Sequence, residues 1–194
     1  MENLCKPYKS CRPIDITQGF GAKNNYPPYK HTGVDFGSWY GTALVAPVNC
    51  KIINIIKDIP FQSLEAEEEE IRKGYGVIMK SAQEPDTYYL YWHCTGYFPV
   101  EIGQFVQQGE MVAQMGNSGY VIQGGVYVPI GNRFLPPYLG THLHFEGFTE
   151  KNGNRKYFDI LPLIDWGIAV KNDNNIFQKM SIILQKMVQT LKTK

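Results

Sequence analysis

Short apolar segments, separated by glycines and other turn residues, recur at regular spacing along most of the chain. The segments expected to form strands are Ile16–Gly21, His31–Gly37, Gly41–Val48, Cys50–Ile56, Tyr75–Lys80, Thr87–His93, Phe105–Gly109, Met111–Met115 and Thr141–Glu146. Tyr75–Lys80 and Thr87–His93 are predicted to form a hairpin, and Phe105–Gly109 and Met111–Met115 a second tight pair. Many short strands with glycine turns between them predict an all-β fold.

Two segments interrupt this rhythm. Residues 57–74 hold several glutamates followed by Arg72 and Lys73, which predicts a solvated loop or a short surface helix. A lid or a cation site is the functional alternative there. Residues 120–139 are rich in glycine, proline and aromatic residues, and they directly precede the last predicted strand. We predict a long loop or a small hairpin for them.

The chain changes character near its C-terminal end. We interpret Asp159–Trp166 as a docking segment. From Ile176 onward, apolar residues recur at the spacing of one helix face, namely Phe177, Met180, Leu184, Met187 and Leu191. This predicts a C-terminal α-helix that packs on its own domain, with a protein partner or an oligomer contact as the alternative. We therefore divide the chain into an extended lead-in (1–15), one domain (16–166) and a C-terminal segment (167–194).

Composition excludes some classes of partner. The chain has 194 residues, 43% hydrophobic and 19% charged, and its net charge is +1. This balance gives no electrostatic case for binding nucleic acid or an anionic membrane. No run of residues reaches the length of a membrane span, and the N-terminal residues lack the apolar core of a signal peptide.

The four cysteines do not point to a metal or redox motif. They are Cys5, Cys11, Cys50 and Cys94, and none of them forms a C-x-x-C pair. Cys5 and Cys11 are close enough in sequence to close a short N-terminal loop, but free thiols fit equally well. Cysteine usage therefore leaves the redox compartment open.

The four histidines carry the chemical signal. His142 and His144 are two residues apart in an alternating run, so on a strand their imidazoles share one face and Leu143 points to the other. His31 and Asp35 lie in a second predicted strand. Two imidazoles and one carboxylate are typical ligands of a catalytic zinc ion that keeps a position for water. The candidate ligands are His31, Asp35 and His144, although the spacing alone also permits His142 in place of His144.

The remaining histidines suit proton transfer. His93 and His142 are expected to stand beside the metal without binding it. A neutral imidazole titrates near neutral pH, so such residues serve as general base or as oxyanion stabiliser.

The motifs, in their order along the chain, resemble the lysostaphin-type zinc metallopeptidases, the LytM family of peptidoglycan endopeptidases. The matching pieces are Ile16–Gly21, the H-x-G-x-D of His31–Asp35, Gly41–Val48, Tyr91–His93, the hairpin Val106–Gly119 and the T-H-L-H-F-E of Thr141–Glu146. The resemblance covers residues 16–146. It departs from the family at Cys94, which replaces a leucine, at the long segment 57–74 and at the large insertion 120–139.

The resemblance implies a compact antiparallel β domain, similar to a duplicated hybrid motif, with its site in a groove. It makes His31, Asp35 and His144 the ligands of Zn2+, and His93 and His142 the catalytic pair. Some members use a tyrosine from the loop before the first ligand, where this chain has Tyr26 and Tyr29. We expect residues 120–139 to form one wall of the substrate groove, and a loop packed on itself is the alternative.

These features predict a zinc endopeptidase that cuts the peptide stems or cross-bridges of bacterial peptidoglycan. We expect it at the cell envelope, as a phage lysin or virion component, since the chain shows no signal peptide. One alternative is a catalytically inactive relative that binds the wall or regulates another enzyme, although all five site positions are filled. The other is a carrier domain, but the tip of the hairpin lacks a lysine.

Overall fold

Antiparallel strands make up most of the regular structure. The computed structural model describes residues 2–9, 15–23, 30–57, 74–133 and 135–166. The strands are β1 (Asp15–Gln18), β2 (Val34–Gly37), β3 (Ala43–Val45), β4 (Cys50–Ile56), β5 (Gly76–Ser81), β6 (Thr87–Trp92), β7 (Phe105–Val106), β8 (Met111–Gln114), β9 (Ile122–Gln123), β10 (Val126–Tyr127), β11 (His142–Lys151) and β12 (Asn154–Phe158). Two short 3-10 helices, η1 (Ile130–Asn132) and η2 (Leu161–Leu163), complete the described elements. The predicted all-β fold is confirmed for these residues.

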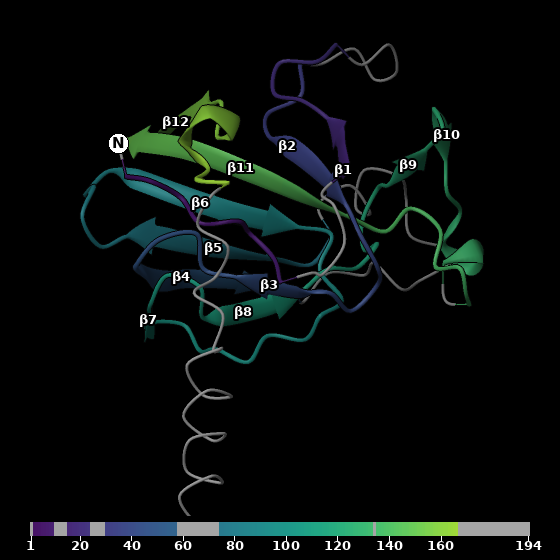
Figure 1. Ribbon diagram of the computed structural model, residues 1–194, viewed down its shortest axis with the longest axis horizontal. Coiled ribbons are helices and arrows are strands. Elements are labelled where there is room, and N and C mark those ends of the chain that lie inside the picture. Colours follow the sequence, from purple (N-terminus) through teal and green to yellow (C-terminus); the bar gives the residue numbers. More distant parts are fainter. Residues whose placement is uncertain (1, 10–14, 24–29, 58–73, 134, 167–194) are drawn as a thin grey trace, which may run out of the picture.

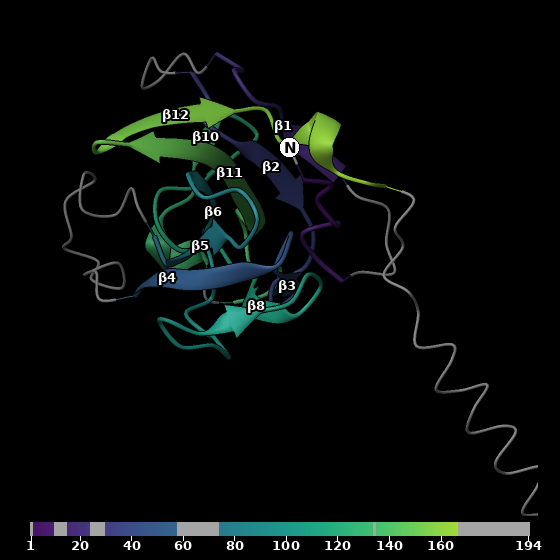
Figure 2. The same cartoon turned by 90° about the vertical axis from the view of Figure 1, so that its left-hand side faces the viewer.

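One large sheet organises the domain around β11. Its strand order is β1-β2-β11-β6-β5-β4-β7, and β12 pairs with the second half of β11 (Figure 1). The sheet curls, so that β11 and β12 lie across the domain from β4 and the separate β3–β8 pair (Figure 2). β11 is therefore bonded to strands from the beginning, the middle and the end of the domain.

The alternation of β11 separates the core from the site, as predicted. Leu143 and Phe145 have no exposed surface and join the main hydrophobic cluster together with Phe36 of β2 and Tyr91 of β6. Burying side chains of this size contributes about 1.5–3 kcal/mol each. Since successive residues of a strand point to opposite faces, the histidines of the same strand are held on the face away from this cluster.

Two strand predictions were wrong in detail. β7 and β8 do not pair with each other: β7 pairs with β4, and β8 pairs with β3. The backbone of Ala46 lies at the turn between them, where it accepts a hydrogen bond from Gly109 and donates one to Glu110. In addition, β2 begins only at Val34, so His31 precedes the strand that carries Asp35.

The segments at the edges of the domain pack on it. Leu4 and Tyr8 of the predicted lead-in are buried in the main cluster, and Leu4 forms a β-bridge with Ile164 of the predicted docking segment. Cys5 is a free buried thiol. Cys11, residues 58–73 and the predicted C-terminal helix lie outside the described residues.

The insertion forms the small hairpin that was expected. β9 pairs with β10, and η1 follows (Figure 1).

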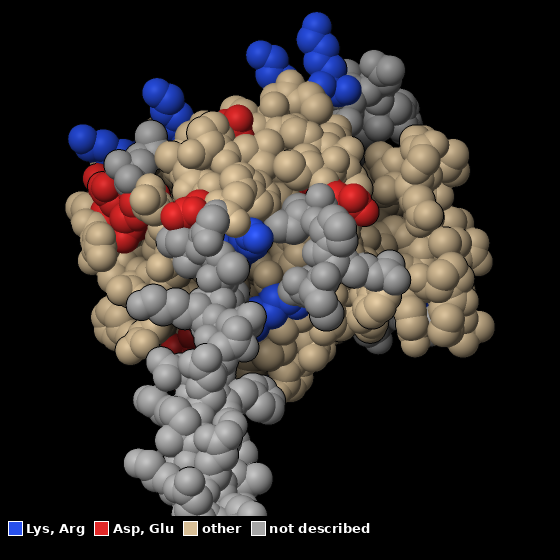
Figure 3. Space-filling view, in the orientation of Figure 1, with Lys and Arg blue, Asp and Glu red and all other residues tan. Residues whose placement is uncertain are grey.

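Positive and negative side chains are interspersed on the face drawn in Figure 3, in keeping with the small net charge. Among the described residues, no helix has the length and apolar character that crossing a bilayer requires.

Candidate metal centre

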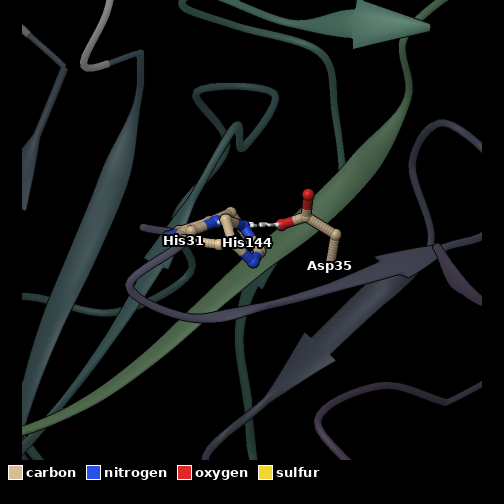
Figure 4. Close-up of side chains that lie close together, drawn as sticks. All are labelled: His31, Asp35 and His144. Atoms are coloured by element: carbon tan, nitrogen blue, oxygen red, sulfur yellow. Dashed lines mark hydrogen bonds and ion pairs between the residues drawn. The ribbon is translucent and has the colours of Figure 1, made fainter. Parts of the chain in front are cut away.

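Three side chains converge from two neighbouring strands and the loop before them. β2 and β11 pair in a register that sets Asp35 opposite His144, and His31 approaches from the loop preceding β2. His144 Nδ1 lies 2.8 Å from Asp35 Oδ1, His31 Nε2 lies 3.1 Å from the same oxygen, and the two ring nitrogens are 2.9 Å apart. The three side chains point toward one another (Figure 4). The predicted ligand residues are thus brought together.

The second nitrogen of each of these imidazoles is already bound. His31 Nδ1–H donates to the Gly19 carbonyl oxygen at 2.9 Å, and His144 Nε2–H donates to the Glu146 carboxylate at 3.1 Å. Glu146 is itself held by the Thr32 hydroxyl at 2.5 Å. A histidine that binds a metal usually donates its other N–H in this way, which fixes the ring and its tautomer. The donor set and its surroundings therefore fit a divalent transition metal.

Charge interactions within the cluster are strong. Burial alone would raise the pKa of Asp35, but hydrogen bonds from His144 and His31 hold it well below its usual range. Burial alone would lower the pKa of His144, yet its bonds to Asp35 and Glu146 raise it to about 9. A cation is therefore favoured at this point between two buried carboxylates, and a metal ion on Nδ1 would replace the proton of His144.

The other two histidines stand beside this cluster. The ring centroids of His93 and His142 are 4.5 Å apart, and His142 Nε2 lies 3.9 Å from Asp35 Oδ2. His93 Nδ1–H donates to the Ser118 carbonyl at 2.6 Å, and His142 Nδ1–H donates to the Gly140 carbonyl at 2.8 Å. Because a carbonyl only accepts, Nε2 of each neutral ring keeps its lone pair. Both rings can therefore accept a proton at Nε2.

The environment keeps these two rings neutral. Burial lowers the pKa of His93 well below its ordinary value, and the nearby His142 lowers it further. Burial also lowers the pKa of His142, although Asp35 partly opposes this. His93 in addition has a φ of 62°. This left-handed conformation is costly for a residue other than glycine and is typically retained at functional sites.

A cavity of about 830 Å³ borders the cluster. Asp35 and His142 lie in its wall, as do residues 122–125 and 137–141. Tyr138, from the insertion, stacks on Tyr40 with ring centroids 4.6 Å apart. The expected position of the insertion beside the site is therefore confirmed, and its hairpin strand β9 lines the cavity.

Gly33, between the first two candidate ligands, has a packing role that the motif alone does not reveal. A Cβ placed there would lie 2.4 Å from the Phe145 carbonyl oxygen and 3.0 Å from His144 Nε2. We expect Gly33→Ala to push β11 away, lowering the free energy of unfolding by about 1–3 kcal/mol, as overpacking does, and weakening metal binding. Denaturant titration and a metal-binding titration measure the two effects.

Gly131→Ala is the matched control, because nothing lies within 4 Å of a Cβ at that position. A Gly33→Ala protein as stable and as metal-loaded as the control would contradict the packing role.

Sequence patterns missed most of the supporting contacts. Glu146 was detectable, since it follows His142 and His144 with the same spacing of two on β11. The carbonyls of Gly19, Ser118 and Gly140 had no signal, because every residue has a carbonyl. Tyr26 and Tyr29 lie outside the described residues, and Cys94 is a fully buried core residue next to His93.

Comparison of the sequence and the structure with known proteins identifies the family of the chain. No curated protein sequence matches the chain. The structure of LytU is 25% identical, with a TM-score of 0.56 over 80% of this chain and 88% of that one. Two further structures share the fold, and each is 20% identical to this chain. The lysostaphin catalytic domain from Staphylococcus simulans has a TM-score of 0.52 and covers 77% of this chain and 90% of its own. The catalytic domain of the prophage-encoded M23 protein EnpA from Enterococcus faecalis has a TM-score of 0.53 and covers 77% of this chain and 92% of its own. The model of peptidase family M23 matches residues 29–157, and the chain belongs to this family of lysostaphin-type (LytM) peptidases.

Proposed function

We propose that this peptidase is a zinc-dependent endopeptidase that hydrolyses peptide stems or cross-bridges of bacterial peptidoglycan. The observation that carries the proposal is the convergence of His31, Asp35 and His144, whose ligand atoms lie within 4.8 Å of one another. Two imidazoles and a carboxylate are the protein ligands of many catalytic zinc sites. We further propose that it acts at the cell envelope, as a phage lysin or virion component, and the similarity to a prophage-encoded M23 protein supports this setting.

His31, Asp35 and His144 would hold the zinc, which supplies a Lewis acid for the scissile carbonyl and lowers the pKa of water. His93 and His142 provide the proton transfers. One Nε2 accepts the proton of the attacking water, and that imidazolium can return it to the leaving amine. The other ring, once it is protonated at Nε2, can stabilise the developing oxyanion. The carbonyls of Ser118 and Gly140 bind Nδ1–H of both rings and so leave Nε2 of each ring free to accept and return a proton.

The lining of the cavity supports the proposal that the substrate is a peptide. Its lining includes Asp35 and His142 and is made up mostly of uncharged polar and glycine residues, among them residues of β1, the hairpin and residues 137–141. Such a surface bonds to peptide groups without requiring a charged side chain. Lysostaphin, which has this fold, is described as an antimicrobial peptidase.

Metal analysis and product analysis test the function together. Protein purified without added metal should contain about one equivalent of zinc, and mass spectrometry of digested peptidoglycan should show newly cleaved stem or bridge peptides. Asp35→Asn is the matched control, because it keeps the shape of the side chain and removes its charge. A folded, zinc-loaded protein that releases no peptide would support the inactive wall-binding alternative instead.

We expect the activity to fall below about pH 6. His93 and His142 must be neutral to accept a proton, and the pKa of each is lowered, so the loss lies below the 6.5 of free imidazole. Protons also compete for the metal-binding nitrogens in this range. The dependence of kcat/KM on pH, with bound zinc measured at every pH, checks this. A profile that stays flat from pH 5 to 8 would contradict it.

A further inference from the structure

A buried arginine in the insertion contacts the segment that orients His93. Arg133 has no exposed surface. Its Nη1 donates to the carbonyl oxygen of Asn117 at 3.0 Å and to that of Gly119, while Nε donates to the carbonyl of Val128 at 2.7 Å. Burying a guanidinium is costly unless its N–H groups are bonded, so these contacts hold the arginine and the carbonyls together.

The two carbonyls bonded to Nη1 flank Ser118. The carbonyl of Ser118 accepts the Nδ1–H of His93, and its hydroxyl accepts the backbone N–H of Tyr75 at 2.8 Å. Ser118 is itself buried. Arg133 thus bonds to the peptide groups before and after the one that carries the Ser118 carbonyl. Rotation of the Ser118 carbonyl away from His93 would strain these bonds.

Residues 117–119 also donate hydrogen bonds to the insertion. Asn117 Nδ2 donates to the carbonyl oxygens of Arg133 at 3.2 Å and Leu139 at 3.0 Å. The Arg133 guanidinium also lies 5.3 Å from the ring centroid of Tyr127 in β10. Residues 117–119 and the insertion therefore form one bonded unit, with the arginine at its centre.

We propose that Arg133 is a positioning residue for His93, acting through Asn117, Gly119 and the Ser118 carbonyl. Its bonds keep that carbonyl aimed at Nδ1 of His93, so that Nε2 keeps its lone pair and can accept a proton. The insertion is then part of the catalytic framework in addition to a wall of the cavity. The expected effect on rate rests on the proposed function, because it assumes that His93 transfers a proton. The expected effect on the His93 ring does not.

Arg133→Met and Arg133→Lys test the inference on the full chain as purified. Methionine fills the space without donors, whereas lysine keeps the charge but has a shorter side chain and a single nitrogen. Arg155→Met is the matched control, since Arg155 pairs with Glu150 at 2.8 Å on the β11–β12 hairpin, away from residues 117–119. Nitrogen-15 NMR of the histidine rings reports the His93 tautomer, and kcat, KM and bound zinc are measured for each protein.

We expect Arg133→Met to move the His93 ring from the Nδ1–H form to a mixture and to lower kcat at least about tenfold, as misplaced catalytic groups do. Bound zinc should stay near the wild-type value, Arg133→Lys should be intermediate, and Arg155→Met should match the wild type. In a His93→Ala background, Arg133→Met should lower kcat little further, because both changes affect the same step.

Other outcomes separate the alternatives. An unchanged His93 ring signal in a folded Arg133→Met protein would overturn the inference, and a change in KM alone would indicate that Arg133 only supports the cavity wall. If Arg133→Met fails to fold, a wild-type ring signal and kcat in Arg133→Lys would overturn it equally. A wild-type protein that cleaves no peptidoglycan would refute the proposed function, while the ring signals would still decide the role of Arg133.

Discussion

His144→Ala should remove both the metal and the activity. The change leaves His31 and Asp35 as the only protein ligands of the proposed site, and it removes one of the two hydrogen bonds to Glu146, leaving the one from Thr32. Two ligands rarely retain zinc where three are normal for a catalytic site. Elemental analysis should find far less than one equivalent of zinc, and peptidoglycan hydrolysis should fall to background.

The fold should survive this substitution, since the imidazole lies on the face of β11 opposite the Leu143 and Phe145 core. His142→Ala is the matched control on the same strand and is expected to keep its zinc. If His144→Ala keeps zinc and His142→Ala loses it, the assignment of the ligand along β11 is reversed.

His93→Ala and His142→Ala should each keep the metal and the fold but lose at least about 100-fold in kcat, the usual scale for a lost general acid or base. Both rings lie farther from the Asp35 carboxylate than His31 and His144 do. The closer of the two is His142, whose Nε2 lies 3.9 Å from Asp35 Oδ2. Bound zinc and turnover of purified peptidoglycan fragments measure the two effects separately.

The double variant adds a further check. Since the two rings are neighbours and serve one reaction, their losses should not multiply. A His93→Ala protein with normal turnover would exclude His93 from the chemistry, and it would also remove the basis for an effect of Arg133 on rate.

The sequence predicted that His31, Asp35 and His144 come together, but it did not predict how β7 and β8 pair. The spacing of two in His142, His144 and Glu146 survives into the structure, because a strand imposes that period. His31 is different: it lies before β2, and its place beside Asp35 depends on backbone bonds to residues 21 and 22 and on the absence of a side chain at Gly33. Local patterns do not encode such long-range contacts.

The insertion shows the same limit. Its glycines and prolines predicted a loop or hairpin, and the hairpin is present. Nothing in the pattern indicated that Arg133 turns inward, since an arginine among loop residues is usually exposed. Its role depends on three carbonyl oxygens that come together only in the folded chain. The prediction that β7 and β8 pair was wrong for a similar reason. The backbone of Ala46, which is distant in sequence, bonds to the turn between them.

The register that sets Asp35 opposite His144 has a consequence for durability. These residues are 109 positions apart, so an ion held between them would clasp two distant parts of the chain. Binding restricted to the folded state adds about 4 kcal/mol of stability when the free ion is roughly a thousandfold above its Kd. If the enzyme works at the cell envelope, as proposed, it meets heat and proteases without chaperones, and its working lifetime would then depend on the local supply of metal.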